Sequence, residues 1–132
     1  APSVTCWGSG TPRREFLHVD DLGEACVFAL EYWDPAADDA PRDPAGQPLP
    51  FLNVGTGVDL TIQELAEAVA SATGYQGEIR WDSSKPDGTP RKILDVSRMA
   101  ALGWQARIQL AQGLIQASDA FTRERVQGEL RV

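Results

Sequence analysis

The chain has 132 residues, enough for one domain with a modest core, and 42% of them are hydrophobic, as in an ordinary globular protein. Its net charge of −7 argues against non-specific nucleic-acid binding, which depends on a basic surface. No apolar run approaches the roughly 20 residues that cross a bilayer, and no signal peptide is visible. We therefore expect a cytoplasmic protein that binds neither nucleic acid nor membrane.

The two cysteines do not form a CxxC pair, and a single histidine cannot complete a usual zinc ligand set. Cys6 lies in an apolar strand pattern, and Cys26 lies on the apolar face of a predicted helix. We expect two buried free thiols in a reducing cytosol, with a disulfide as the alternative, and no metal site.

The first elements in chain order are a strand, a loop and a helix. Residues 4–7 read as a short strand that ends at Gly8, and residues 15–19 can be extended. Asp20 is the expected N-cap of a helix that ends near Trp33. The face that this helix is expected to bury comprises Leu22, Cys26, Ala29, Leu30 and Trp33.

A Pro- and Asp-rich segment, residues 34–50, interrupts the regular pattern and is expected to be a flexible linker loop. Residues 51–54 then read as a buried strand. The T-x-x-E spacing from Thr61 to Glu64 predicts a capped helix that Gly74 stops.

The last third of the chain begins with residues 78–81, which alternate as a half-exposed strand does. A short helix is expected from about Asp95 to Leu102, and an amphipathic helix over residues 110–125. Residues 126–132 are expected to form a frayed tail. The order of strands and helices predicts one small α/β domain that spans residues 1–132.

Positive charge is concentrated in two loops rich in Gly and Pro. Five of the 12 Lys and Arg residues lie there: Arg13, Arg14, Lys85, Arg91 and Lys92. An acidic protein that gathers its cations in this way has a plausible site for a small anion, and we expect the two loops to face each other across it. The alternative is that these are solvated loop charges.

Within the first loop, Arg14 could clamp phosphate oxygens, and Trp7 could stack on a base or a sugar. The alternative places Trp7 in the core and pairs Arg14 with a nearby acid. The Gly8-Ser9-Gly10 turn matches no dinucleotide or P-loop fingerprint and is interpreted as a link between two strands. His18 has no positioned nucleophile beside it and is interpreted as structural.

The runs from Trp7 to Asp21 and from Ser84 to Lys92, together with Asn53–Asp59 and Leu102–Trp104, resemble the GDP-L-fucose synthase family. These are GDP-4-keto-6-deoxy-D-mannose 3,5-epimerase/4-reductases of the extended short-chain dehydrogenase/reductase superfamily. The R-E-F-x-H-V-x-D pattern marks only the wider epimerase/dehydratase group, whereas K-P-D-G-T-P-R-K is much more specific. The resemblance covers nearly all of residues 4–121.

The resemblance implies the C-terminal, substrate-binding part of such an enzyme. The family's first half is a Rossmann domain that carries the NADP(H) fingerprint, the Ser/Tyr/Lys catalytic set, and the Cys and His of epimerisation, and none of these is in this sequence. Cys6, Cys26 and His18 do not correspond to them. We therefore expect no bound cofactor and no catalysis by this chain alone.

By the same resemblance, a GDP-sugar is the expected ligand. The implied substrate-binding residues are Trp7, Arg14, Lys85, Asp87 and Lys92, with Arg14 near the diphosphate. One alternative is a stand-alone interaction module that self-associates through the surface which a Rossmann domain would cover. Another is a fragment of a different sugar-nucleotide epimerase or dehydratase.

Overall fold

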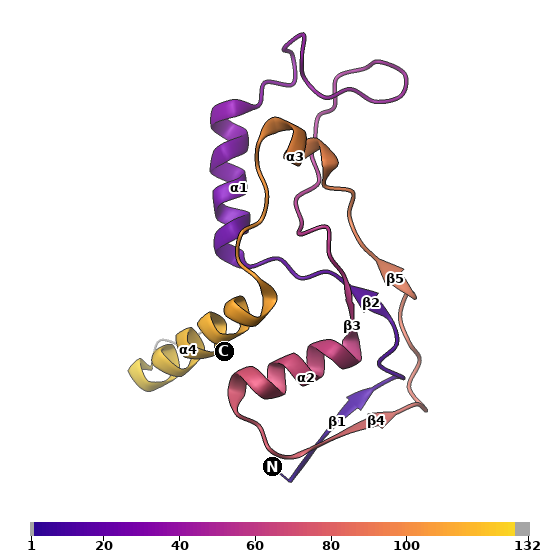
Figure 1. Cartoon of the computed structure of the whole chain (residues 1–132), viewed down its shortest axis with the longest axis vertical. Coiled ribbons are helices and arrows are strands. Elements are labelled where there is room, and N and C mark those ends of the chain that lie inside the picture. The colour runs from indigo at the N-terminus through magenta and orange to yellow at the C-terminus, as the bar shows by residue number, and fades with distance from the viewer. Residues whose placement is uncertain (1, 129–132) are drawn as a thin grey trace. The chain divides into compact units, whose positions relative to one another are not determined.

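The computed structural model describes residues 2–128 and has the expected α/β character, with four helices and several short strands among them (Figure 1). The chain forms two compact units, each assembled from separate segments. Unit 1 takes the residues up to Arg14, the segment Leu60–Lys92 and the residues from Gln109 onward. Unit 2 takes Glu15–Asp59 and Ile93–Ile108.

Unit 1 contains every strand of the described chain, in two small sheets. Strand β1 (Ser3–Trp7) runs parallel to β4 (Glu78–Asp82). Strand β2 (Arg13–Arg14) lies between β3 (Leu60–Thr61), to which it is antiparallel, and β5 (Arg91–Lys92), to which it is parallel (Figure 1). The strands predicted at residues 4–7 and 78–81 are therefore confirmed.

Helix α2 (Ile62–Thr73) has the capping box that its sequence predicts. The Thr61 hydroxyl accepts a hydrogen bond from the Glu64 backbone N–H (3.1 Å), and the Glu64 carboxylate accepts one from the Thr61 N–H (2.7 Å). The helix ends at Gly74, which adopts the left-handed conformation with φ 67°. Helix α4 (Leu110–Gln127) packs against α2.

Unit 2 is built on a small core of Ala25, Met99 and Trp104. Helix α1 (Val19–Tyr32) supplies Ala25, and the short helix α3 (Ser97–Leu102) supplies Met99. The N-cap of α1 is His18, whose Nδ1 accepts a hydrogen bond from the Asp20 N–H (3.2 Å), so the assignment of this cap to Asp20 was wrong. His18 therefore has the structural role that its position suggested.

The buried face of α1 also differs from the one expected. The helix buries Asp21 and Ala25, whereas Leu30 is 87% exposed and Cys26 is exposed as well. The cause is a long-range contact: Asp21 Oδ2 accepts hydrogen bonds from the backbone N–H groups of Arg107 (3.1 Å) and Ile108 (2.9 Å). Both thiols are free, but neither is fully buried as expected: Cys6 is half-buried and Cys26 is exposed.

Residues 51–54 form no strand, which corrects the sequence prediction. Leu52 and Val54 pack against the core of unit 2 instead, and no described strand pairs with this segment. The preceding segment, residues 34–50, has turns and one isolated bridge between Arg42 and Pro48. Of the tail expected at residues 126–132, positions 126 and 127 belong to α4, and positions 129–132 lie outside the described residues.

Candidate functional site

The Gly-rich loop that joins β1 to β2 has three of its backbone N–H groups engaged within the protein. The Gly8 N–H donates to the Asp82 carbonyl (2.9 Å), and the Ser9 N–H donates to Asp87 Oδ1 (2.8 Å). The Thr11 N–H donates to Ser9 Oγ (3.2 Å). Because these donors are used, the loop does not offer the row of open amides that cradles a phosphate. An anion here depends on side chains.

The same loop is held from its carbonyl side by the first turn of α2. The Gln63 N–H donates to the Gly10 carbonyl and the Ile62 N–H to the Pro12 carbonyl, each at 2.9 Å. Gly10 has φ +77°, and a Cβ on it would lie 2.9 Å from the Trp81 ring. Glycine at this position therefore allows both the turn and the close approach of the ring.

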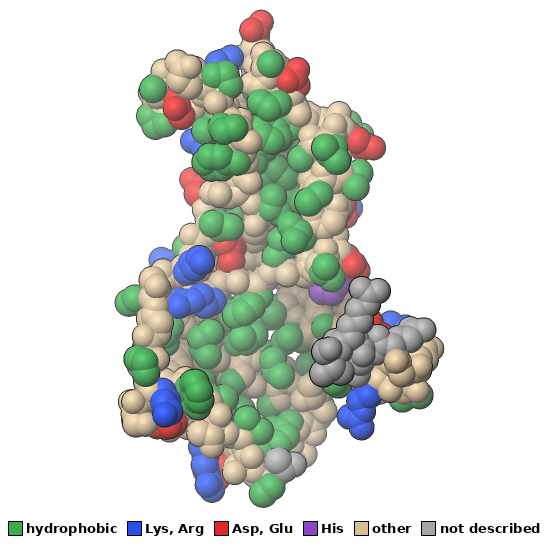
Figure 2. Space-filling view, turned by 180° about the vertical axis from the view of Figure 1, so that it is seen from behind, with side chains coloured by type: hydrophobic (Ala, Val, Ile, Leu, Met, Phe, Trp, Pro, Cys, Tyr) green, Lys and Arg blue, Asp and Glu red, His purple; other side chains and the backbone are tan. Residues whose placement is uncertain are grey.

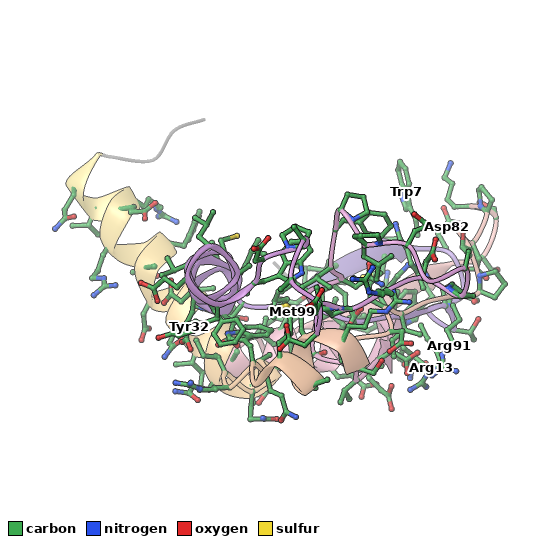
Figure 3. The ribbon with its side chains drawn as sticks, turned by 90° about the horizontal axis from the view of Figure 1, so that it is seen from above. Trp7, Arg13, Tyr32, Asp82, Arg91 and Met99 are labelled. Carbon is green, nitrogen blue, oxygen red and sulfur yellow. The ribbon has the colours of Figure 1, made fainter. Side chains whose placement is uncertain are left out.

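The register of the β3-β2-β5 sheet sorts the cations into two pairs. Arg13 is paired with Arg91, and Arg14 with Lys92. Paired residues project to the same face of a sheet, and successive residues to opposite faces. Arg14 and Lys92 therefore share one face. Figure 3 shows Arg13 and Arg91 directed to one side of the ribbon and Trp7 to the other.

Arg14 brings the two basic loops together. Arg14 is half-buried, and its Nη1 donates to the carbonyl of Arg13 (2.7 Å). A Cβ on Gly88, in the second loop, would lie 3.2 Å from Arg14 Nη2. Among residues 2–128, Arg14 forms no ion pair with a carboxylate, contrary to the alternative that it pairs with an acid.

Trp7 is 74% exposed, so it does not belong to a core. The Nζ atom of Lys85 lies 5.4 Å from the centroid of its ring, within the range of a cation–π interaction. An exposed indole with an ammonium group beside it can contact a planar or sugar ring and its phosphate at the same time.

Asp87 has both carboxylate oxygens in contact with Ser9. Oδ1 accepts from the Ser9 N–H (2.8 Å), and Oδ2 accepts from the Ser9 hydroxyl (2.6 Å). The hydroxyl bond first, and then the N–H bond, hold the pKa of Asp87 below its ordinary value. Sequence reasoning missed Ser9, although its hydroxyl beside a Gly-rich turn was a signal for a loop-to-loop hydrogen bond.

All five residues expected in the site, Trp7, Arg14, Lys85, Asp87 and Lys92, belong to unit 1. In the described part of the chain, no group of three or more His, Cys, Asp or Glu side chains is arranged to hold a metal ion. Over residues 2–128, no helix has both the length and the apolar composition needed to cross a membrane.

Comparison with known proteins finds similarity to one group of enzymes. Residues 1–40 match the NAD dependent epimerase/dehydratase family. GDP-L-fucose synthase of Escherichia coli K12 is 49% identical over 121 residues, which are 92% of this chain and 36% of that protein.

Two solved structures from Campylobacter jejuni have the same fold over this region. A GDP-6-OMe-4-keto-L-xylo-heptose reductase is 33% identical with a TM-score of 0.82, over 92% of this chain and 34% of that one. A GDP-mannoheptose C4 reductase with NADP bound is 32% identical with a TM-score of 0.74, over 91% and 35%. The chain thus spans about a third of the length of these relatives.

Proposed function

The chain is homologous to the C-terminal part of the GDP-L-fucose synthases, within the NAD-dependent epimerase/dehydratase family, and from this premise we propose that it is a nucleotide-sugar-binding region. Its ligand is a GDP-linked sugar of the GDP-4-keto-6-deoxymannose or GDP-fucose type. The observation that carries the proposal is the register of the β3-β2-β5 sheet, which puts Arg14 and Lys92 on one face and Arg13 and Arg91 on the other.

The chemistry of these side chains suits a diphosphate attached to two rings. The planar guanidinium of Arg14 can donate two parallel hydrogen bonds to phosphate oxygens, and Lys92 adds a second positive charge on the same face. Trp7 offers an exposed ring surface for the base or the sugar, and Lys85 is the cation beside it. In an acidic protein, these cations give a local positive potential for the anion.

In a longer enzyme of this family NADPH would supply the hydride, and this chain's residues do not fit that cofactor. The amides of Gly8, Ser9 and Thr11 in its Gly-rich loop are used within the protein, and the sequence has no G-x-G-x-x-G and no Tyr-x-x-x-Lys. We therefore expect binding without turnover. Measurable NADPH oxidation with GDP-4-keto-6-deoxymannose by the purified chain would contradict this.

Binding is tested by isothermal titration calorimetry with GDP-fucose, and with UDP-glucose to test the choice of base. Arg14→Ala should weaken GDP-fucose binding about 10- to 100-fold, the effect of losing charge-assisted hydrogen bonds. Arg13→Ala is the matched control, because it removes the same charge from the adjacent residue on the opposite face. Equal affinities of wild type and Arg14→Ala would remove Arg14 from the site.

A second proposed function is self-association, which the surface of α1 supports. Apolar side chains at helical spacing form an exposed stripe on this helix: Val19, Leu22, Cys26, Val27 and Leu30. Figure 2 shows that many hydrophobic side chains reach the surface on the face in view. A stripe of this kind favours burial against another apolar surface, and a second copy of the chain provides one.

Self-association is tested by sedimentation velocity over a range of concentrations in reducing buffer. The wild-type chain should show a concentration-dependent dimer, and Leu30→Glu should shift it to monomer because Leu30 is 87% exposed in the stripe. Glu31→Lys, at the neighbouring exposed position, is the control for a change of charge on the same helix. A wild-type chain that sediments as a monomer at all concentrations would refute this function.

A further inference from the structure

A series of hydrogen bonds joins the loop after β1 to the loop after β4. The Ser9 hydroxyl has a single hydrogen and donates it to Asp87 Oδ2 (2.6 Å). The Thr11 hydroxyl, 2.7 Å from Ser9 Oγ, must therefore be the donor in that contact, together with the Thr11 N–H (3.2 Å). The Ser9 N–H completes the link through Asp87 Oδ1 (2.8 Å).

We propose that Asp87 is a positioning residue whose carboxylate ties these two loops together, and that Ser9 is its partner. In this assignment Asp87 acts on the nucleotide-sugar through the residues that it places, and the inference rests on the function proposed above. The two residues are 78 positions apart in the sequence, so this link restrains loops that chain connectivity leaves independent.

The neighbours of this link are the residues proposed to contact the ligand. Lys85 is two positions before Asp87, and Trp7 two positions before Ser9, and the Lys85 ammonium lies 5.4 Å from the Trp7 ring. Gly88, directly after Asp87, lies against the Arg14 guanidinium. The β1–β4 and β2–β5 pairings hold the ends of the two loops, and the link between them restrains the distance of Lys85 from Trp7 and the contact of the second loop with Arg14.

Gly8 leaves the space that the Asp87 carboxylate occupies in this link. Gly8 has φ +86°, and a Cβ at this position would collide with Asp87 Oδ1. The Asp87 carboxylate can thus approach the backbone of the first loop only because residue 8 is glycine. Its negative charge is held by two donors of Ser9, and these hydrogen bonds favour the ionised form.

A double-mutant cycle on the full chain tests this assignment, with GDP as the probe in calorimetric titrations. Ser9→Ala and Asp87→Asn should each weaken GDP binding about three- to tenfold, as the loss of a hydrogen bond does. The double variant should be within about twofold of the weaker single variant, because both changes break the same link. Ser9→Thr keeps the hydroxyl and should bind as the wild type does.

A measurement without ligand separates this inference from the proposed function. In the wild type, ring currents of Trp7 should shift the Lys85 side-chain NMR signals upfield. Ser9→Ala and Asp87→Asn should both lose this shift, and Ser9→Thr should retain it. If the wild type shows the shift but binds no GDP, the proposed function fails and the link between the loops stands.

Three results would overturn the positioning role while leaving the function intact. The first is that Asp87→Asn weakens GDP binding and Ser9→Ala does not. Asp87 would then be a direct contact of the ligand. The second is a double variant whose loss is the product of the two single losses. The third is a Lys85 shift that persists in both variants.

Discussion

Glu15 joins three segments of unit 2, and replacing it with glutamine should destabilise the chain measurably. Oε2 accepts hydrogen bonds from the backbone N–H groups of Thr56 and Gly57, both at 3.0 Å, and Oε1 accepts one from Leu94 (2.7 Å). Glutamine has one carbonyl oxygen, so Glu15→Gln leaves at least one of these N–H groups facing an amide NH2. The hydrogen bonds from Gly57 and Leu94 are exposed, so the expected loss in the free energy of unfolding is the net value of a hydrogen bond, about 0.5–1.5 kcal/mol.

Asp21→Asn is the matched control, because it makes the same chemical change at a carboxylate with a different geometry. Asp21 is 2% exposed, and a single oxygen, Oδ2, accepts both of its backbone hydrogen bonds. The carbonyl oxygen of asparagine can take that place, so the expected loss is below about 1 kcal/mol.

Urea unfolding followed by tryptophan fluorescence measures both losses, since Trp104 is 3% exposed in unit 2. A loss for Glu15→Gln no larger than that for Asp21→Asn would refute this reasoning from acceptor geometry.

Three further changes have defined outcomes. Thr61→Ala removes the hydroxyl that caps α2 and should lower the free energy of unfolding by about 1 kcal/mol in urea titrations; an unchanged midpoint would show that the cap contributes nothing. Gly10→Ala should lower it by about 1–3 kcal/mol because of its φ of +77° and the Trp81 ring at 2.9 Å, and full stability would contradict that conformation. Because the pKa of Asp87 is lowered, the stabilisation from its contact is present above the ordinary aspartate pKa of about 3.9 and is lost as the pH falls through the lower folded-state pKa. Carboxyl ¹³C NMR should therefore find this pKa raised in Ser9→Ala, and an identical titration in both proteins would exclude Ser9 as the cause.

Local signals predicted the parts of the fold that depend on neighbours in the sequence. The capping box of Thr61 and Glu64 acts within one helical turn, and Gly74 ends that helix through its own backbone conformation. Such features need no knowledge of the rest of the chain, which is why the position of α2 followed from its residues.

The errors concern features that depend on distant residues. The apolar spacing on α1 identified a helix correctly, but the buried face follows Asp21, whose partners Arg107 and Ile108 are 86 and 87 positions away. Residues 51–54 have the composition of a strand, yet a strand needs a neighbour, and the described chain provides none.

For the site, too, the sequence predicted some features and missed one that depends on distant residues. Charge clustering and the family resemblance both selected the two basic loops, and the sheet register pairs Arg14 with Lys92. Neither signal could reveal that Asp87 is engaged by Ser9, because that contact also joins residues far apart in the sequence. The role of the five selected residues in binding stays a prediction.

The most direct test of the nucleotide-sugar site is an NMR titration of the chain with GDP-fucose. The proposal predicts that the indole N–H of Trp7 and the side-chain signals of Arg14 and Lys92 shift together and saturate. The signals of Arg13 and Arg91, which project to the opposite face, should stay in place. Shifts confined to Arg13 and Arg91, or no shifts at saturating ligand, would contradict it.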